Sequence, residues 1–319
     1  MIYLEDQPTT PTYAYPLERH QVETTLVTII CISTIVTNAI AILSVATSVF
    51  QRESIDYYLL SLLVCDLLCG IFILPLSIYS ASTGEWIYGD FLCKLTGYME
   101  ITLWTITVYT FMWMSVDRYL AIRKPLRYVV LQTRTRCQCW VLFTWLTSVF
   151  LCSPPLLGFS TGNFYKDGYI CTLDLKNMIP YSITLAILVL APSVITILYS
   201  YFFIFITMYR LRQYMTQEER EYATATSENL SNPDHMMSFI LTIVFWISWF
   251  PWFGLRIWEE ANGYLTDHYY HFFFLWFGIL DCVWKPLIYA SISPKFRIGM
   301  RVFCTSLCCR RKFRQQLIV

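Results

Sequence analysis

Four ionisable residues interrupt otherwise apolar stretches of this 319-residue chain: Asp66, Glu100, Asp281 and Lys285. A charge in such a stretch is costly and is usually functional, because it binds an ion, a proton or a charged ligand, or pairs with an opposite charge. Asp281 and Lys285 are four residues apart, so on a helix they share a face, with the acid before the base, which is the favourable order for an ion pair. The pattern predicts that these side chains bind a charged ligand or ion, or pair with one another.

The stretches that carry these residues are long enough to cross a membrane. Only 14% of the chain is charged and 56% is hydrophobic, whereas a soluble domain has roughly 25% charged residues. About 20 apolar helical residues span a hydrocarbon layer of about 30 Å. We therefore expect an all-α membrane protein, a seven-transmembrane helix bundle, and exclude a soluble enzyme or a nucleic-acid-binding protein. The expected helices cover 22–50, 55–81, 90–123, 134–158, 177–214, 233–261 and 267–290.

The distribution of basic residues predicts the orientation. On one side of the expected helices lie 17 of the 23 Lys and Arg residues, and the positive-inside rule makes that side cytoplasmic. We expect a multi-pass protein of the plasma membrane with an extracellular N-terminus (1–21), a transmembrane domain (22–290) and a cytoplasmic segment (291–319). Residues 1–23 contain no apolar core of a signal peptide, so the first helix should be the membrane anchor.

Cysteines divide according to the side of the membrane. Only Cys93 and Cys171 fall on the expected outer, oxidising side, so they are the obvious disulfide pair. Cys304, Cys308 and Cys309 follow the last span within a basic segment, which is the setting for palmitoylation. A metal site at these cysteines would lack histidine partners and the usual spacing, so we predict no metal.

One sequence motif carries a family resemblance. Asp117-Arg118-Tyr119 begins the segment DRYLAIRKP at the inner end of the third span, and this resembles the signature of rhodopsin-like (class A) G-protein-coupled receptors. Further markers occur in the family's order, at Asn38, Leu62, Asp66, Trp86, Cys93, Trp145, Pro192, Phe245 to Pro251, Pro286 to Tyr289, and Phe296-Arg297. The resemblance implies a short amphipathic eighth helix, and a heterotrimeric G protein, arrestin and a receptor kinase as partners.

Proline residues and the charged motif point to a switching bundle. Pro192, Pro251 and Pro286 each remove a backbone donor inside a span, so three helices should bend. By resemblance, Arg118 is released on activation to meet the G protein; the alternative is an interfacial pair with Asp117 that only snorkels. The residues assigned to coupling and activation are Asp117, Arg118, Tyr119, Tyr201, Trp249, Pro251, Lys285, Pro286 and Tyr289.

Glu100 is the expected ligand anchor. By resemblance it occupies the position where biogenic-amine receptors keep an Asp that binds the ligand's ammonium, and the seventh-span text FLWFGILDC is similar to theirs. Ile279 replaces an aromatic hydroxyl, and the fifth span offers only Thr184 as a hydroxyl. Two alternatives are a protonated Glu100 and a pair with Arg256 or His271. The residues assigned to ligand binding are Glu100, Trp104, Thr184, Trp249, Trp252, Phe253, Arg256, His271, Leu275 and Trp276.

Lys285 stands where the family has the Asn of its NPxxY motif. In relatives, Asp66 and a hydroxyl corresponding to Thr107 hold a sodium ion. We expect no cofactor, because the Lys285 ammonium could stand in for sodium, paired with Asp66 or Asp281. The expected core polar network is Asn38, Asp66, Thr107, Asp281 and Lys285.

The inner end of the sixth span also departs from the family. It has Ser231 and His235 where many relatives have an acid that latches Arg118. High basal signalling is therefore expected.

The favoured function is a receptor, without catalytic activity, that transmits an extracellular small-molecule signal, with a cationic amine as the candidate ligand, to G proteins. One alternative is a receptor-like protein that is activated by its own outer loop or does not signal. A transporter built around the four ionisable residues would usually show inverted repeats and broken helices, and the sequence shows neither.

Overall fold

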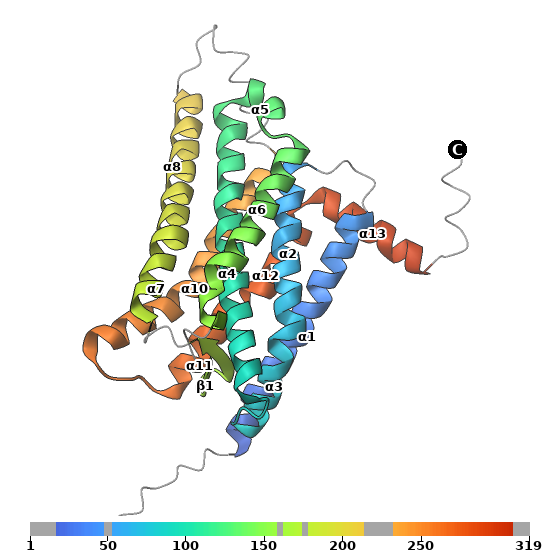
Figure 1. The fold of residues 1–319 in the computed structure, drawn as a ribbon. Helices are drawn as coiled ribbons and strands as arrows, with labels where there is room; N and C mark the ends of the chain where they lie inside the picture. The colour runs from blue at the N-terminus through green and yellow to red at the C-terminus, as the bar shows by residue number, and fades with distance from the viewer. Residues whose placement is uncertain (1–16, 48–52, 158–161, 174–177, 214–231, 309–319) are drawn as a thin grey trace, which may run out of the picture.

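The computed structural model describes residues 17–47, 53–157, 162–173, 178–213 and 232–308. Long helices run side by side in a bundle (Figure 1). The α-helices are α1 (Leu17–Thr47), α2 (Ser54–Phe72), α3 (Leu74–Thr83), α4 (Gly89–Arg123), α5 (Pro125–Leu131), α6 (Arg134–Cys152), α7 (Ile179–Leu185), α8 (Ala191–Gln213), α10 (Pro233–Asn262), α11 (His268–Ile279), α12 (Asp281–Ile292) and α13 (Pro294–Cys308).

These helices confirm the seven-span bundle. Six helical stretches of the described chain are long and apolar enough to cross a membrane. The more polar α4, at 35 residues, is the seventh. Three spans consist of two helices each: α2 with α3, α7 with α8, and α11 with α12. α13 projects from the bundle as the eighth helix (Figure 1).

Proline explains most of the breaks in the spans. Pro75 lies in the first turn of α3, directly after the break at Ile73, because proline fits a first helical turn but disrupts a helix interior. Before Pro192, residues Ala186–Leu190 form a π-helical turn between α7 and α8. Pro251 and Pro286 lie inside α10 and α12. Several spans are thus interrupted by a helix break, a π-helical turn or an internal proline.

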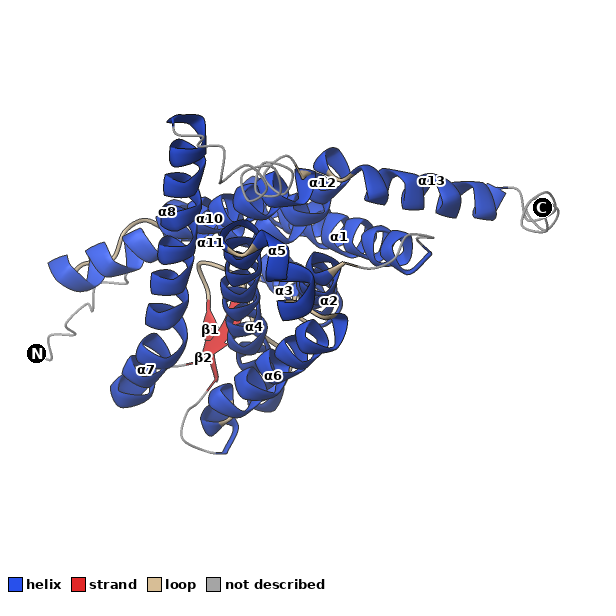
Figure 2. Ribbon diagram, turned by 90° about the horizontal axis from the view of Figure 1, so that it is seen from above, coloured by secondary structure: helices blue, strands red, loops and turns tan. Residues whose placement is uncertain are grey.

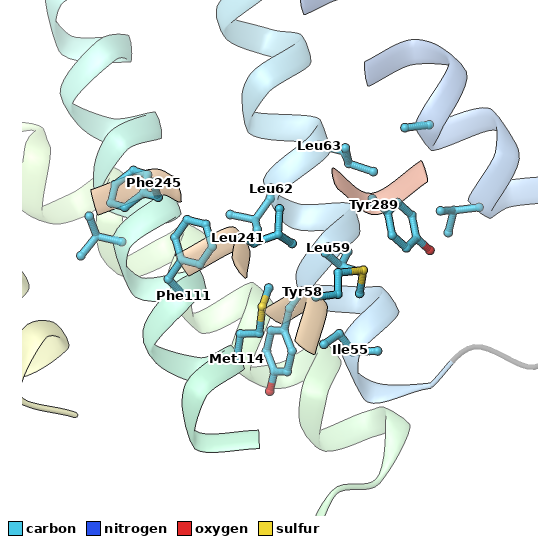
Figure 3. Packing of buried hydrophobic residues seen from close by; sticks show 14 of the residues in the cluster. Ile55, Tyr58, Leu59, Leu62, Leu63, Phe111, Met114, Leu241, Phe245 and Tyr289 are labelled. Carbon is cyan, nitrogen blue, oxygen red and sulfur yellow. The ribbon is translucent and has the colours of Figure 1, made fainter. Parts of the chain in front are cut away.

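Apolar side chains of several spans meet at the centre of the bundle (Figure 3). Tyr58 of α2 lies beside Met114 of α4, and Phe111 of α4 packs against Phe245 of α10 with ring centroids 5.0 Å apart. All four are no more than 1% exposed. Many other large apolar side chains, such as Phe250 at 76% exposed, point away from the bundle. An outward apolar surface is what a lipid-facing helix requires.

Two short elements lie at opposite ends of the bundle and were not predicted from the sequence. The helix α5 follows α4 at one end, which we call the Arg118 end. At the other, the strands β1 (Gly162–Tyr165) and β2 (Ile170–Leu173) form an antiparallel hairpin, with Phe164 paired to Cys171. The hairpin lies within the outline of the bundle (Figure 2), and we call this the hairpin end. The Cys93–Cys171 disulfide, as predicted, ties β2 to the start of α4.

Candidate functional site

A central cavity of about 390 Å³ runs inside the bundle from the hairpin towards Lys285. Its wall is mostly apolar and aromatic, which is typical of small-molecule sites. Five of the residues predicted to bind ligand line it, from α4 and α10: Glu100, Trp104, Trp249, Trp252 and Phe253. Ile170, Thr172 and Leu173 of the hairpin also line it, so the hairpin forms a cap over the cavity.

The Glu100 carboxylate faces this cavity without an ion-pair partner. Within the described part of the chain, no hydrogen bond or ion pair joins it to another residue. Arg256 instead pairs with Glu259, with Nη1 and Oε2 3.0 Å apart. His271 also contacts Glu259, from Nε2 to Oε1 at 2.8 Å. The two pairings of Glu100 that the sequence left open are therefore not formed.

Aromatic rings surround the space next to Glu100. The rings of Trp104 and Phe253 meet edge to face, with centroids 5.7 Å apart. Trp249 lies close to Gly278 of α11, where an added Cβ would come within 3.0 Å of the indole ring. Glycine at 278 therefore helps the indole to pack close to the helix, because a Cβ there would press on the ring. The box of aromatic faces is suited to a cation or a flat ring.

The fifth span presents a different hydroxyl from the predicted one. Thr184 is exposed, and its hydroxyl donates to the Pro180 carbonyl oxygen at 2.8 Å. Ser182, which the sequence did not single out, lines the cavity, and its hydroxyl donates to the Met178 carbonyl oxygen at 3.2 Å. The π-helical turn at Ala186–Leu190 holds an extra residue, so it rotates the turns before it relative to an uninterrupted helix. A regular helical period could not foresee this rotation.

The other residues predicted to bind ligand hold the hairpin. Trp276 donates from Nε1 to the Gly168 carbonyl oxygen at 3.2 Å. A Cβ at Gly168 would lie 2.3 Å from the Leu275 side chain, so a larger residue in this turn would have to displace that side chain. The Tyr165 hydroxyl bonds to His271 Nδ1. Leu275, Trp276 and His271 therefore act on the cap rather than on the cavity wall.

At its inner end the cavity reaches a buried charge cluster. Lys285 Nζ lies 2.8 Å from Asp66 Oδ1 and 2.8 Å from Asp281 Oδ2. All three residues are no more than 3% exposed. Asn38 donates to the Cys282 carbonyl oxygen at 2.8 Å, and the Thr107 hydroxyl donates to the Leu103 carbonyl oxygen. Lys285 thus contacts both acids, of which the sequence predicted one or the other.

Lys285 occupies part of the site where the family resemblance places a sodium ion. An ammonium already lies at hydrogen-bond distance from Asp66, where a hard cation would need the carboxylate oxygen.

Comparison with known proteins decides the family. The family model described as "7 transmembrane receptor (rhodopsin family)" matches residues 37–289. The chain belongs to the rhodopsin family of seven-transmembrane receptors. It is a cell-surface receptor that signals through G proteins, not an enzyme.

Individual relatives are distant in sequence. The human histamine H2 receptor is 24% identical over 301 residues, covering 92% of this chain and 82% of that protein. A mouse protein named G-protein coupled receptor 52 is 26% identical over 270 residues, with 80% and 74% covered. An octopamine receptor of Heliothis virescens is 35% identical over 135 residues, 42% of this chain and 28% of that one. Squid rhodopsin has the same fold, with a TM-score of 0.78 at 19% identity over 98% and 94% of the chains.

At the other end of the receptor, Arg118 is held by its own helix and by α5. Its Nε donates to Asp117 Oδ2 at 3.0 Å, and its Nη2 donates to the Tyr128 hydroxyl at 3.1 Å. The Tyr128 hydroxyl lies 3.1 Å from both Asp117 oxygens, and Gln132 Nε2 donates to Asp117 Oδ1 at 2.9 Å. Arg118 and Asp117 are 5% and 0% exposed. Arg118 is buried, so this geometry is not that of a snorkelling surface pair.

An acid does occur in the first turn of the receptor's sixth span, one that the sequence reasoning missed. Asp234 is buried, and its Oδ2 lies 3.8 Å from Lys295 Nζ of α13. Lys295 also pairs with Glu53, before α2. Partial burial opposes the charge of Lys295, but the hydrogen bond to Glu53 and the charge of Asp234 raise its pKa. The Asp234–Lys295 contact thus joins α10 to α13. His235, the next residue after Asp234, is also buried, and Ser231 lies outside the described residues.

The remaining activation residues lie between helices of the receptor. The Tyr201 hydroxyl of α8 is 3.4 Å from Thr242 Oγ1 of α10. Tyr119 packs against Tyr199, with ring centroids 5.9 Å apart, and Tyr289 packs against Phe296 of α13 at 4.6 Å. Cys304 and Cys308 fall within α13, and Cys309 lies outside the described residues.

Proposed function

We propose that the receptor binds a small cationic amine in the central cavity, with the ammonium paired to Glu100. The observation that carries this proposal is the Glu100 carboxylate, which faces an aromatic cavity without a charged partner in the described chain. A carboxylate in low-dielectric surroundings favours an ammonium, which supplies both charge and hydrogen bonds. The names of two relatives, the histamine H2 and octopamine receptors, are consistent with this ligand class.

The aromatic residues and Ser182 have separate roles in this proposal. Trp104, Trp249 and Phe253 present ring faces to the cation, and Ser182 offers a hydroxyl from the fifth span. A ligand that packs against Trp249 can act on α10, which contains Pro251. The ligand activates the receptor only as far as it binds the active arrangement more tightly.

A matched pair of variants tests this proposal. Glu100→Gln removes the charge that pairs with the ammonium, and truncation of one partner of a buried charge pair costs about 2–5 kcal/mol. We expect the affinity for an active amine, found in a panel of biogenic amines, to fall about 30-fold or more. Glu85→Gln, which removes an exposed carboxylate at the hairpin end, is the control. Equal amine affinity in wild type and Glu100→Gln would exclude the anchor.

We also propose an orientation with the hairpin end outside the cell and the Arg118 end in the cytoplasm. The basic residues concentrate at the Arg118 end, and the disulfide belongs to the hairpin end, as expected for an oxidising exterior. In this orientation Arg118 meets the G protein, arrestin and a receptor kinase are further partners, and Cys304, Cys308 and Cys309 are palmitoylation sites beside the bilayer.

Lys285 is proposed to replace sodium as the cation of the inner cluster. Its ammonium contacts both Asp66 and Asp281 at 2.8 Å. One ammonium between two carboxylates leaves the cluster with a net charge of minus one, which a bound proton can balance. The receptor is therefore expected to fold and bind ligand independently of sodium.

A second mode of activation is favoured by one observation. Three residues of the hairpin line the cavity, and the Cys93–Cys171 disulfide fastens them there. A segment already present in the ligand cavity can bias the bundle without any ligand. Under this alternative, basal output is high and does not change in Glu100→Gln, because no amine is involved.

A further inference from the structure

Three of the receptor's four histidines gather at the hairpin end: His20, His268 and His271. His268 differs from the others because a carboxylate faces each of its ring nitrogens. Its Nδ1 lies 2.8 Å from Asp167 Oδ1, and its Nε2 lies 3.0 Å from Glu23 Oε1. The His268 and Glu23 side chains are 12% and 6% exposed.

The two contacts impose a protonation state on His268. A neutral imidazole has one N–H, whereas an imidazolium has two. Only the imidazolium can donate to Asp167 and Glu23 together; a neutral ring would direct a lone pair at one of the two carboxylates. The hydrogen bond from His268 lowers the pKa of Asp167, which keeps that acid ionised.

His271, three residues along the same helix, shows the contrast. Its Nε2 contacts Glu259 Oε1, and its Nδ1 bonds to the Tyr165 hydroxyl, which can donate. A neutral His271 with its hydrogen on Nε2 satisfies both contacts. The geometry therefore requires a second ring proton, and so an imidazolium, at His268. At His271 the neutral ring is sufficient.

The proton at His268 joins three separate elements. Glu23 belongs to α1, His268 begins α11, and Asp167 lies in the turn of the hairpin. The same turn holds Tyr169 at a φ of 56°, a left-handed conformation that is unfavourable for a residue with a side chain. The Tyr169 hydroxyl donates to Glu23 Oε2 at 2.7 Å. Contacts from outside the turn stabilise it, and Glu23 and His268 supply two of them beside the Trp276 hydrogen bond to Gly168.

We propose that His268 is a proton-binding site through which pH sets how tightly the hairpin caps the central cavity. With the proton bound, α1, α11 and the hairpin turn are joined. Without it, one of the two carboxylate links is lost and the cap loosens. The charged and titratable groups around this site are His20 and Glu23 on α1, Tyr165, Lys166, Asp167 and Tyr169 on the hairpin, Arg256 and Glu259 on α10, and His271 on α11.

Hydrogen exchange in the hairpin tests the proposal directly. Purified full-length receptor in lipid nanodiscs is compared at about pH 6 and about pH 8, the range in which histidine titrates, with correction for the intrinsic pH dependence of exchange. We expect the amides of residues 162–173 to exchange about tenfold faster at the higher pH, because a charge-assisted hydrogen bond is lost. His268→Gln and Asp167→Asn should show no such difference.

Asp267→Asn is the matched control. Asp267 is an exposed acid next to His268 that makes no side-chain cap to α11, so this variant should keep the wild-type pH difference. The proposal is overturned if wild-type exchange does not depend on pH, or if both His268→Gln and Asp167→Asn keep the full difference. Asp167 is 40% exposed, so Asp167→Asn should fold even if His268→Gln does not.

The physiological reading rests on the proposed orientation, in which the hairpin faces the outside of the cell. If the hairpin faces the outside of the cell, a change of extracellular pH at constant cytosolic pH should change signalling by the wild-type receptor and not by Asp167→Asn. A pH-dependent hairpin in nanodiscs without this cellular effect would support the proton site and count against the orientation. The two failures are therefore distinguishable.

Discussion

At the scale of the residue, Lys285 stands where the family motif has an Asn. Its type and its spacing from Asp281 predicted an ion pair on one helix face, and the structure shows that pair. The contact with Asp66 could not follow from local spacing, because 219 residues separate the two in sequence. Only the packing of α12 against α2 brings them together.

The Lys285 cluster predicts insensitivity to sodium. The melting temperature of purified wild-type receptor should be the same in sodium and potassium chloride, because an ammonium occupies the Asp66 oxygen. Lys285→Asn removes that ammonium and should create a sodium-dependent rise of about 2–4 °C. A strong, sodium-specific shift in the wild type would contradict this role of Lys285.

Asp167 predicts a dependence of stability on acid pH. The hydrogen bond from His268 lowers the pKa of Asp167, so its stabilising contribution is complete above the unfolded value of about 4 and is lost as the pH falls through the lower folded value. In thermal unfolding between about pH 3 and about pH 6, wild type should lose more stability than Asp167→Asn as the pH falls. Parallel profiles for the two proteins would show that the contact does not stabilise the fold.

At the scale of the element, the long helices were predictable and the short ones were not. A span needs about 20 apolar residues, and that signal survives the interruptions at Asp66, Glu100 and Lys285. The seven-residue α5 and the four-residue strands have no such signal, since tertiary contacts and the disulfide hold them. The π-helical turn likewise exchanged Thr184 for Ser182 in the cavity wall. The spans were therefore predictable from local sequence, whereas the hairpin cap and the orientation of the fifth span depend on contacts between distant segments.

The helix α5 predicts an effect on basal activity. The Tyr128 hydroxyl holds Arg118 and Asp117 together, and in the proposed activation Arg118 leaves this site to meet a G protein. Tyr128→Phe removes one such link, worth about 0.5–1.5 kcal/mol, so basal nucleotide exchange should rise about 2- to 10-fold. Val130→Ser, an exposed change in α5, should leave it unchanged. An unchanged rate of basal nucleotide exchange in Tyr128→Phe would show that α5 does not restrain Arg118.

At the scale of the whole molecule, one cavity connects the two regions that the sequence marked as unusual. Glu100 lies in its wall and Lys285 lies at its inner end, so a ligand at the first can act on the charge cluster at the second. Between that cluster and Arg118 run helices that contain proline, with Pro251 in α10 and Pro286 in α12. The chain is thus arranged as a receptor in which hairpin, cavity, charge cluster and Arg118 follow one another along the bundle axis.

The most direct test of the account is nucleotide exchange on purified G proteins by the receptor in nanodiscs, with and without the amine panel. Wild type should accelerate exchange, either basally or with an amine, and Arg118→Ala should reduce that acceleration at least about tenfold at equal receptor concentration. Acceleration that Arg118→Ala leaves intact would contradict the proposed coupling site. A wild-type receptor that is silent under every condition would contradict the account of a signalling receptor.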